Sequence, residues 1–420
     1  MIRVLVLSLV TLSAVVAWNI SVFFATSEGW LKSPIVKSDS APAFAAAAEE
    51  AVTDEHTGNL GMILIEDGEV AERYFMSTGT PVDGSSVYQV ASLGKWITAW
   101  GVMVLVEEGA IDLDTPISEY LTRWQLPESA FDPSGVTVRR LLSHTAGLTD
   151  GLGYDGFERA EEVQSLVASL TRALDASPGN SGVVELGAEP GSEWNYSGGG
   201  YTILQLVIEE VSGQSFAEFM SQRVFVPLGM ERSTFNHEEA IRLGLAQNFN
   251  LNGDTEPFRW YTALAATSLF TSADDLALFI KAQATPEGQS VLSGQSLELI
   301  RTPHASQMGA DIWGLGAMLY AQNNDGGYII GHDGNNGPAI NTVARIDPAT
   351  GDGIVILSTG SEMLATELAG EWVFWKTGNI DSLMFLMSFE AMLLWMGVGS
   401  LIIVILAIAF GWRGRRPRLH

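Results

Sequence analysis

The sequence predicts an α+β domain enclosed by two apolar segments, and three patterns support this prediction. Residues 60–75 (LGMILIEDGEVAERYF) alternate apolar and polar side chains around an Asp-Gly pair, which is typical of a β-hairpin. Residues 342–359 repeat this pattern around a turn that contains Pro and Gly. Between the hairpins, residues 92–108 carry a helical pattern, and residues 361–375 carry another after the second hairpin. Strands at both ends of the domain, with helices between them, predict one sheet assembled from distant segments.

Both ends of the chain are apolar. Residues 4–24 contain only scattered Ser, Thr and Asn among apolar residues, and this length fits either a membrane span or a signal peptide. Small residues at 25–27 (ATS) offer a cleavage site, so residues 1–25 are interpreted as a signal anchor or a signal peptide. Residues 391–410 (AMLLWMGVGSLIIVILAIAF) carry no charge over about one bilayer thickness, which predicts a transmembrane helix.

The residues after the second apolar segment predict its orientation. The tail 411–420 (GWRGRRPRLH) contains four arginines, which place it in the cytoplasm by the positive-inside rule and outweigh two lysines in the N-terminal linker. The domain between the apolar segments is then expected in the periplasm, anchored to a bacterial inner membrane. Its expected bounds are 47–376, with linkers at 26–46, which is rich in Ala, Ser and Pro, and at 377–390.

The composition excludes several classes of protein. A chain of 420 residues with 47% hydrophobic residues can bury a substantial core. Its 49 acidic and 22 basic residues give a net charge of -27, which argues against nucleic-acid binding because clustered Lys and Arg neutralise phosphates. The absence of cysteine excludes disulfides, thiolate metal sites and Cys nucleophiles. The histidines have no metal-ligand spacing, and neither H-E-x-x-H nor G-x-S-x-G occurs, so we expect no metal, no cofactor and no α/β-hydrolase nucleophile.

A serine and a lysine stand three residues apart in QVASLGKWITAW, residues 89–100. Ser92 would lie at the positive end of the helix dipole and Lys95 one turn later on the same face, so the two side chains can meet. A desolvated lysine loses its proton near neutral pH and can act as the base for a serine hydroxyl. The alternative is a helix-capping serine followed by a lysine with its charge in solvent. Of the five lysines, only Lys95 has a serine three residues before it.

Three further phrases follow Ser92-Leu-Gly-Lys95 along the chain. They are LLSHTAGL at 141–148, EPGSEWNYSGGGY at 189–201 and GHDGNNGP at 331–338. With these phrases, residues 45–375 resemble the serine β-lactamase and penicillin-binding-protein superfamily, in its class C-like branch of β-lactamase-related serine hydrolases, family VIII-type esterases and D-amino-acid peptidases. The resemblance implies a β-lactamase/transpeptidase-like α/β sandwich, in which helices flank an antiparallel sheet and a mostly helical subdomain is added.

The resemblance assigns catalytic roles to three residues. Ser92 is expected to be the acylated nucleophile and Lys95 its partner. Tyr196, which opens YSG, matches the tyrosine that moves protons between the nucleophile, the leaving group and the deacylating water. This role agrees with elementary chemistry, because a phenol with a pKa near ~10 becomes a usable base only where an adjacent cation stabilises its phenolate. We therefore expect Tyr196 and Lys95 to lie close together.

The resemblance also implies a substrate-binding wall. His332-Asp-Gly334 matches the K-T-G or H-x-G motif on the strand beside the site, where Gly334 lets the substrate lie against that strand. The backbone N–H groups of Asn335 and Ser92 would form the oxyanion hole. His332 is expected to face the substrate, whereas His144 in LLSHTAGL is expected to hold a loop.

Two departures from the family pattern bear on the substrate. The second motif is Y-S-G, whereas class C β-lactamases have Y-x-N, whose Asn contacts the amide of the β-lactam; Gly198 has no side chain. The third motif begins with His332, which is mostly uncharged at neutral pH and attracts a carboxylate less firmly than Lys. Its charge is expected to grow as the pH falls from about 8 to about 6. Both departures argue against an efficient β-lactamase.

The sequence therefore predicts a membrane-tethered periplasmic serine hydrolase that acts through an acyl-enzyme on small esters, amides or peptides with D-residues. A D-Ala-D-Ala carboxypeptidase, a weak β-lactamase and a peptidase that removes an acyl-D-amino-acid cap from an exported metabolite are alternatives within this class. A different class would be a non-catalytic module that binds cell-wall peptides. Intact Ser92, Lys95 and Tyr196 argue against such a module, since binding alone does not need them. The acyl and leaving groups of the substrate are left open.

Overall fold

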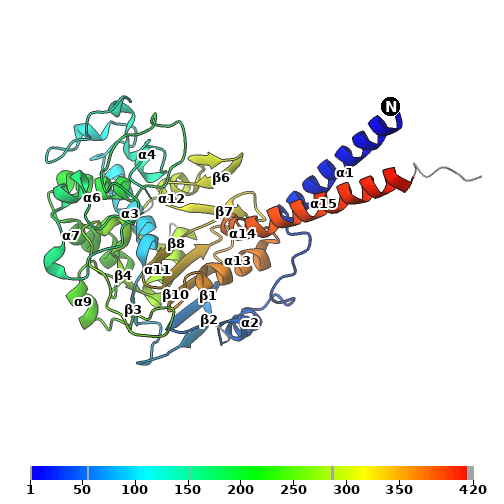
Figure 1. Cartoon of the computed structure of the whole chain (residues 1–420). Helices are drawn as coiled ribbons and strands as arrows, with labels where there is room; N and C mark the ends of the chain where they lie inside the picture. The colour runs from blue at the N-terminus through cyan, green and yellow to red at the C-terminus, as the bar shows by residue number, and fades with distance from the viewer. Residues whose placement is uncertain (1, 54–55, 152, 285–287, 414–420) are drawn as a thin grey trace, which may run out of the picture.

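The computed structural model describes residues 2–53, 56–151, 153–284 and 288–413, and its central element is an eight-stranded sheet (Figure 1). The strands are β1 (Leu60–Glu66), β2 (Glu69–Met76), β5 (Ala305–Gln307), β6 (Ala310–Trp313), β7 (Met318–Gln322), β8 (Tyr328–Asn336), β9 (Ile340–Ile346) and β10 (Gly353–Thr359), with β3 (Val87–Gln89) and β4 (Phe270–Ser272) as a separate pair. Their order is β2-β1-β10-β9-β8-β7-β6-β5, with antiparallel neighbours throughout. The first two strands lie beside the last one, which confirms the predicted sheet of distant segments.

Helices and loops make up the rest of the described chain. They are α1 (Ile2–Ser27), α2 (Ala41–Thr53), α3 (Gly94–Glu107), α4 (Val138–Leu142), α5 (Leu166–Thr171), α6 (Gly198–Ser212), α7 (Phe216–Met220), α8 (Val226–Leu228), α9 (His237–Arg242), α10 (Leu264–Thr267), α11 (Ala273–Ala284), α12 (Gly294–Arg301), α13 (Leu364–Thr377), α14 (Ser382–Met387) and α15 (Phe389–Arg413), with short turns η1 (Ala91–Leu93), η2 (Ile117–Glu119), η3 (Pro133–Gly135), η4 (Ala160–Glu162) and η5 (Ser221–Phe225). The helices from α4 to α10 lie between β3 and β4 in the sequence and form the expected helical subdomain (Figure 1).

Both predicted hairpins are present in the sheet. Asp67 and Gly68 form the turn between β1 and β2 with φ angles of 51° and 75°, a left-handed conformation that Asp and Gly tolerate. β9 and β10 pair along their whole length, and every residue of both strands is buried. Strands that are buried on both faces require cover on both sides of the sheet.

Alternating side chains of β1 show how the two faces are covered. Ile63 and Ile65 belong to the larger core, which also contains the buried side chains of α3 and α11. Leu60, Met62 and Leu64 belong to a second core on the opposite face, with α2 and α13. The sheet is therefore sandwiched between helices, and α3, which follows the candidate nucleophile, lies on the side of the larger core.

The linker expected at 26–46 is wrong for residues 41–46, because α2 begins at Ala41. One face of this helix is buried, with Ala41, Phe44, Ala48 and Val52. The Phe44 ring stacks on Trp375 of α13 at 5.1 Å between centroids. Spacings of three and four residues are helical, and alanine is the strongest helix former. These residues therefore form a packed helix rather than a flexible tether.

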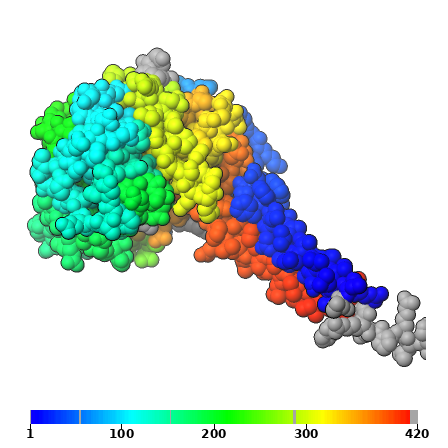
Figure 2. All heavy atoms as spheres, turned by 90° about the horizontal axis from the view of Figure 1, so that it is seen from above, coloured from blue at the N-terminus to red at the C-terminus, as the bar shows by residue number. Residues whose placement is uncertain are grey.

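The two apolar ends form long helices that run side by side away from the domain (Figures 1 and 2). α1 and residues 389–411 of α15 are long and apolar enough to cross a membrane, with mean hydropathies of 2.0 and 2.6. A signal sequence near an N-terminus meets the same criteria. The helices are antiparallel, since the N-terminus of α1 lies at the far end of the pair, beside the C-terminal part of α15 (Figure 1).

The second expected linker, 377–390, also contains a helix. α14 begins after the fully buried Asp381, whose carboxylate accepts the backbone N–H of Met384 at 2.8 Å. α15 then includes the whole predicted span 391–410. Residues 414–420, which hold three of the four tail arginines, lie outside the described residues.

Replacing Phe44 distinguishes a packed helix from a tether. Because the ring is fully buried, Phe44→Ala should lower the free energy of unfolding by about 3 kcal/mol. Ala46→Ser, on the exposed face of the same helix, should change it by less than about 0.5 kcal/mol. Urea unfolding of both variants measures these values. Equal stabilities would mean that α2 does not pack on the domain.

Candidate active site

The candidate nucleophile lies in η1, the short turn that leads directly into α3. Ala91 has a φ of 49°, a left-handed conformation that strains a residue with a Cβ. The turn is held on both sides. The Val90 N–H donates to the Leu269 carbonyl (2.9 Å), and the Thr342 hydroxyl donates to the Val90 carbonyl (2.8 Å). Ser92 is half-buried between two buried neighbours, so the fixed turn leaves part of this residue accessible.

The Lys95 amine is buried beside Ser92. The lysine is 1% exposed, and its Nζ donates to Ser92 Oγ at 3.0 Å and to the Ala266 carbonyl at 2.6 Å. Burial lowers the pKa of Lys95 to about 7, because a charged ammonium is poorly solvated there, and the charge of Asp150 opposes this shift. Near neutral pH a substantial fraction of Lys95 is neutral, with a lone pair for the Ser92 proton. The structure thus brings Ser92 and Lys95 together as their spacing predicts.

Tyr196 joins these two residues from the loop before α6. Its ring centroid lies 4.9 Å from Lys95 Nζ. Burial raises the pKa of the Tyr196 phenol, and a hydrogen bond with Ser92 lowers it. The phenol is therefore protonated at neutral pH unless a cation stabilises its phenolate. The expected proximity of Tyr196 and Lys95 is confirmed, whereas the proton-transfer role stays a prediction.

The LLSHTAGL loop holds the Tyr196 loop, as expected for His144. Nδ1 of His144 accepts the Ser197 N–H at 3.1 Å, and the His144 carbonyl accepts the Asn195 N–H at 2.8 Å. The imidazole also packs on the Tyr196 ring, with 4.3 Å between centroids. Burial lowers the pKa of His144 well below its ordinary value, so the ring is neutral, as an acceptor at Nδ1 requires.

His332 lies in the wall of the site, where burial opposes the expected gain of charge at lower pH. It is 2% exposed, and its ring centroid lies 6.5 Å from that of Tyr196 and 5.4 Å from that of Trp313. Burial, assisted by the charge of Lys95, lowers the pKa of His332 to about 3. The expectation that His332 gains charge between about pH 8 and about pH 6 is therefore wrong, because burial disfavours the imidazolium.

The hydrogen bond of His332 determines which ring nitrogen carries the proton. Nδ1 lies 2.6 Å from the Asp333 carbonyl oxygen, which can only accept, so Nδ1 is the donor. Nε2 is then an acceptor, and it is buried without a hydrogen-bond partner in the described part of the chain. The third motif therefore offers a neutral acceptor rather than a cation.

The structure gives Gly334 a role beyond the expected one. A Cβ at this position would lie 2.1 Å from the Val90 carbonyl oxygen and 3.1 Å from the Leu93 nitrogen. Glycine therefore lets β8 lie directly against the turn that carries the nucleophile. Contact between Gly334 and a substrate stays a prediction.

One edge of β8 is open beside this turn. β7 pairs with β8 only as far as Gly331, so residues 332–336 have β9 alone as a strand partner. The Asn335 side chain is held by Glu362, because its Nδ2 donates to the Glu362 carbonyl at 2.5 Å. An oxyanion hole formed by the N–H groups of Ser92 and Asn335 stays a prediction.

The structure adds two residues that the sequence patterns do not indicate. Asp150 accepts the Gly199 N–H at 2.7 Å and acts on Lys95 through its charge. The Tyr154 ring would lie 3.0 Å from a Cβ on Gly198, so it occupies the space beside the missing side chain of Y-S-G. Both residues come from the loop after LLSHTAGL. An acidic residue two positions after that phrase was the available signal.

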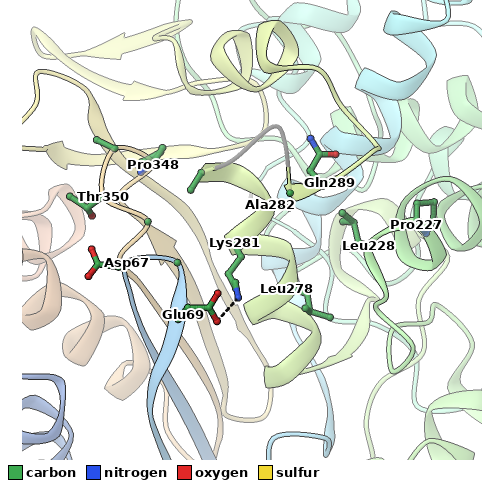
Figure 3. Close-up of a pocket in the computed structure, with 15 residues that line it drawn as sticks. Asp67, Glu69, Pro227, Leu228, Leu278, Lys281, Ala282, Gln289, Pro348 and Thr350 are labelled. Carbon is green, nitrogen blue, oxygen red and sulfur yellow. Dashed lines mark hydrogen bonds and ion pairs between the residues drawn. The ribbon is translucent and has the colours of Figure 1, made fainter.

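A separate cavity of about 510 Å³ lies between the β1–β2 turn, α11 and the β9–β10 turn (Figure 3). An ion pair between Lys281 and Glu69, at 3.1 Å, forms part of its lining. Its lining includes none of Ser92, Lys95 and Tyr196, so it is not the candidate active site. Among the residues that the structure describes, no group of three His, Asp or Glu side chains could hold a metal ion.

Comparisons with known proteins agree with this geometry. The Beta-lactamase family profile matches residues 44–372. Penicillin-binding protein 4 of Amycolatopsis lactamdurans is 30% identical over 330 residues, which cover 73% of this chain and 82% of that protein. The octameric penicillin-binding protein homologue from Pyrococcus abyssi has a similar fold, with a TM-score of 0.66 and 24% identity over 83% of this chain and 77% of its own. The structure of SurE with D-Leu has a TM-score of 0.61 and 26% identity over 79% and 74% of the two chains.

The pKa of Lys95 predicts how the reactivity of Ser92 depends on pH. The neutral amine is the base, so the rate at which a fluorophosphonate labels Ser92 should rise between about pH 6 and about pH 8, with a midpoint near 7. Lys95→Ala should lower this rate about 100-fold or more and remove the rise. Intact-mass spectrometry follows the labelling. A wild-type rate that is flat across this range would contradict the role of Lys95 as the base.

Proposed function

We propose that this chain, which belongs to the beta-lactamase family, is a serine hydrolase that forms an acyl-enzyme on Ser92. The observation that carries the proposal is the 3.0 Å contact between Lys95 Nζ and Ser92 Oγ at a buried lysine. A desolvated ammonium costs stability, and a protein that only binds peptides has no use for it. A non-catalytic binding module is therefore the weaker candidate.

In the proposed reaction, Ser92 Oγ attacks the carbonyl carbon of the substrate while its proton passes to neutral Lys95, directly or through Tyr196. The N–H groups of Ser92 and Asn335 would stabilise the oxyanion. The tetrahedral intermediate collapses as the bond to the leaving group breaks, and the leaving group takes a proton from Tyr196. Water then attacks the acyl carbon and gives a proton to the same pair. The bond between the acyl carbon and Ser92 Oγ breaks, Oγ takes that proton back, and the acid is released.

The wall at His332 favours substrates whose leaving group has no free carboxylate. The neutral imidazole presents an acceptor at Nε2, which matches an amide N–H better than a carboxylate. The Lys95 ammonium is already engaged by Ser92 and the Ala266 carbonyl. The net charge of -27 adds long-range repulsion against anions. Small esters and amides are therefore preferred over D-Ala-D-Ala peptides with a free carboxylate.

Amides and peptides with D-residues fit this proposal better than β-lactams. SurE, one of the structural relatives, is known in a structure with D-Leu. Efficient β-lactam hydrolysis is disfavoured because Gly198 has no side chain and the Tyr154 ring occupies the space beside it. A carboxypeptidase and a weak β-lactamase therefore rank below an esterase or amidase.

A matched substrate pair tests the proposal. N-acetyl-D-Ala-D-Ala and its C-terminal amide differ only in the charge of the leaving group, and kcat/KM should be about tenfold higher for the amide. The ratio should be constant between about pH 6 and about pH 8, because burial holds the pKa of His332 at about 3. Ser92→Ala should abolish both reactions, and His332→Lys should raise the preference for the acid. A wild-type preference for the acid would contradict the substrate assignment, and turnover by Ser92→Ala would contradict the mechanism.

The proposed membrane anchor consists of α1 and α15 together. The Trp18 indole N–H donates to the Trp395 carbonyl at 3.0 Å, and the Asn19 amide donates to the Ser400 hydroxyl at 3.0 Å. A Cβ on Gly399 would lie 2.0 Å from the Trp18 indole nitrogen, so only glycine fits there. Polar pairs and small residues at such contacts are typical of packed membrane helices. They support a retained α1 over a cleaved signal peptide.

The chain after α1 also packs against the domain. Lys32 pairs with Glu371 of α13 at 2.5 Å and lies 5.4 Å from the Phe374 ring centroid. The Trp375 indole donates to the Ser38 carbonyl at 3.0 Å. These contacts support an anchor whose N-terminal helix is joined to the domain by a segment that packs on α13.

Intact mass and reporter fusions test this anchor. The purified protein should keep residues 1–27, because α1 is a structural partner of α15. A periplasm-active reporter inserted at 377–382 should be active, and the same reporter after residue 420 should be silent. Gly399→Leu should reduce the yield of folded membrane protein because it clashes with Trp18, whereas Gly397→Leu, with no atom within 4 Å, should not. Cleavage near residue 26 would contradict a retained α1, and reversed reporters would place the domain in the cytoplasm.

A further inference from the structure

We propose that Asp150 is a positioning residue of the catalytic unit, which holds the Tyr196 loop through the first turn of α6 and acts on Lys95 through its charge. This inference rests on the proposed function, because it concerns how Lys95 and Tyr196 share a proton. It assigns a role to a residue outside the three motifs.

Both carboxylate oxygens of Asp150 are engaged at the N-terminus of α6. Oδ1 accepts the Ser197 hydroxyl, and Oδ2 accepts the Gly199 N–H at 2.7 Å. The Ser197 hydroxyl oxygen in turn accepts the Gly200 N–H at 2.8 Å. Since Ser197 directly follows Tyr196, this network ties the position of the phenol to Asp150 across 47 residues of sequence.

The glycines of YSGGG make this contact possible. A Cβ on Gly199 would lie 2.9 Å from the Asp150 carboxylate and 2.6 Å from the Val184 side chain. Any side chain at that position would push the acid away from the helix. Gly199 is therefore required for the close approach of Asp150, which explains part of a motif that otherwise has no side chains to contribute.

Asp150 is the charged group that opposes burial at Lys95. Within the described residues, the Tyr196 and Tyr201 rings lie beside the Lys95 amine, and Asp150, His144 and His332 interact with it through charge. Burial lowers the pKa of both histidines and raises the pKa of both tyrosines, so all four are neutral at neutral pH. Burial raises the pKa of Asp150, and this shift is opposed by the hydrogen bonds from Ser197 and Gly199 and by the charge of Lys95. Its two oxygens both accept hydrogen bonds, as a carboxylate does.

The charge of Asp150 bears directly on proton transfer. Burial lowers the pKa of Lys95 and Asp150 raises it, so Asp150 favours the ammonium that forms when neutral Lys95 takes the Ser92 proton. Without Asp150, Lys95 would lose its proton at a lower pH and would be a weaker base for the Ser92 hydroxyl. Asp150 thus both holds the Tyr196 loop in position and supplies a charge that acts on Lys95.

Asp150→Asn separates the charge from the hydrogen bonds. The amide can still accept the Gly199 N–H and can donate to the Ser197 hydroxyl, so the loop keeps its contacts. The rise of fluorophosphonate labelling with pH should move to lower pH, and the plateau rate should fall roughly tenfold, since charge-assisted hydrogen bonds become neutral ones. Labelling is followed by intact mass over about pH 5 to pH 9 on the full-length protein.

Three variants serve as controls. Ser197→Ala removes the bridging hydroxyl but keeps the charge, so it should slow labelling without moving the rise. Asp155→Asn, an exposed carboxylate on the same loop, should change neither quantity. Asp150→Glu keeps the charge with a longer side chain, so its rise should stay at the wild-type pH even where the rate falls, and it replaces Asp150→Asn if that variant unfolds.

The outcomes separate this inference from the proposed function. A labelled Ser92 whose pH dependence is the same in wild type and Asp150→Asn would overturn the inference alone. A displaced rise in Asp150→Glu would overturn it as well. A wild-type protein that is not labelled at Ser92 would overturn the proposed function, and the inference would fall with it.

Discussion

The burial of the Lys95 amine beside the Ser92 hydroxyl is the constraint on which the rest of the site depends. α3 is buried on all sides from Gly94 to Leu105, so its only lysine is withdrawn from solvent. The cost of burying the Lys95 amine is offset by its hydrogen bonds with the Ala266 carbonyl and the Ser92 hydroxyl and by the charge of Asp150. The same low polarity that makes the ammonium unstable makes the neutral amine a base near neutral pH.

Alternate residues of β8 connect this site to the opposite face of the sheet. His332 and Gly334 face the nucleophile, whereas the Asp333 carboxylate pairs with the fully buried Arg345 at 3.0 Å. Arg345 also pairs with Asp381 at 2.6 Å, the residue that caps α14 at the start of the path to α15. Buried ion networks of this kind define geometry more than they add stability, because desolvation offsets their attraction. One strand therefore carries both the wall of the candidate site and the ion pair that leads, through Arg345, to the start of α14.

Local patterns were sufficient where short-range geometry decides the outcome. The hairpins at 60–75 and 342–359 follow from a period of two and from turn residues, and both are present. The meeting of Ser92 and Lys95 follows from a spacing of one helical turn. Residues 41–46 were wrongly predicted as linker because their Ala-rich helix packs on the sheet and on α13. α13 lies more than 300 residues later in the chain. Composition does not contain that contact.

The sequence by itself determined the α+β fold class, the meeting of Ser92 and Lys95, and the two apolar ends, since each is encoded in residue type and local spacing. The expectation that Tyr196 joins them came from the resemblance to a known family. Only the tertiary structure decided which titratable side chains are buried, and burial shifts their pKa values. His332 has the residue type of a pH switch, but its burial beside Lys95 removes that behaviour. Asp150 lies 55 positions from Lys95 in the chain, and its effect exists only because two loops meet at the start of α6. Charge and solvation depend on neighbours in space, and these are set by packing rather than by order along the chain.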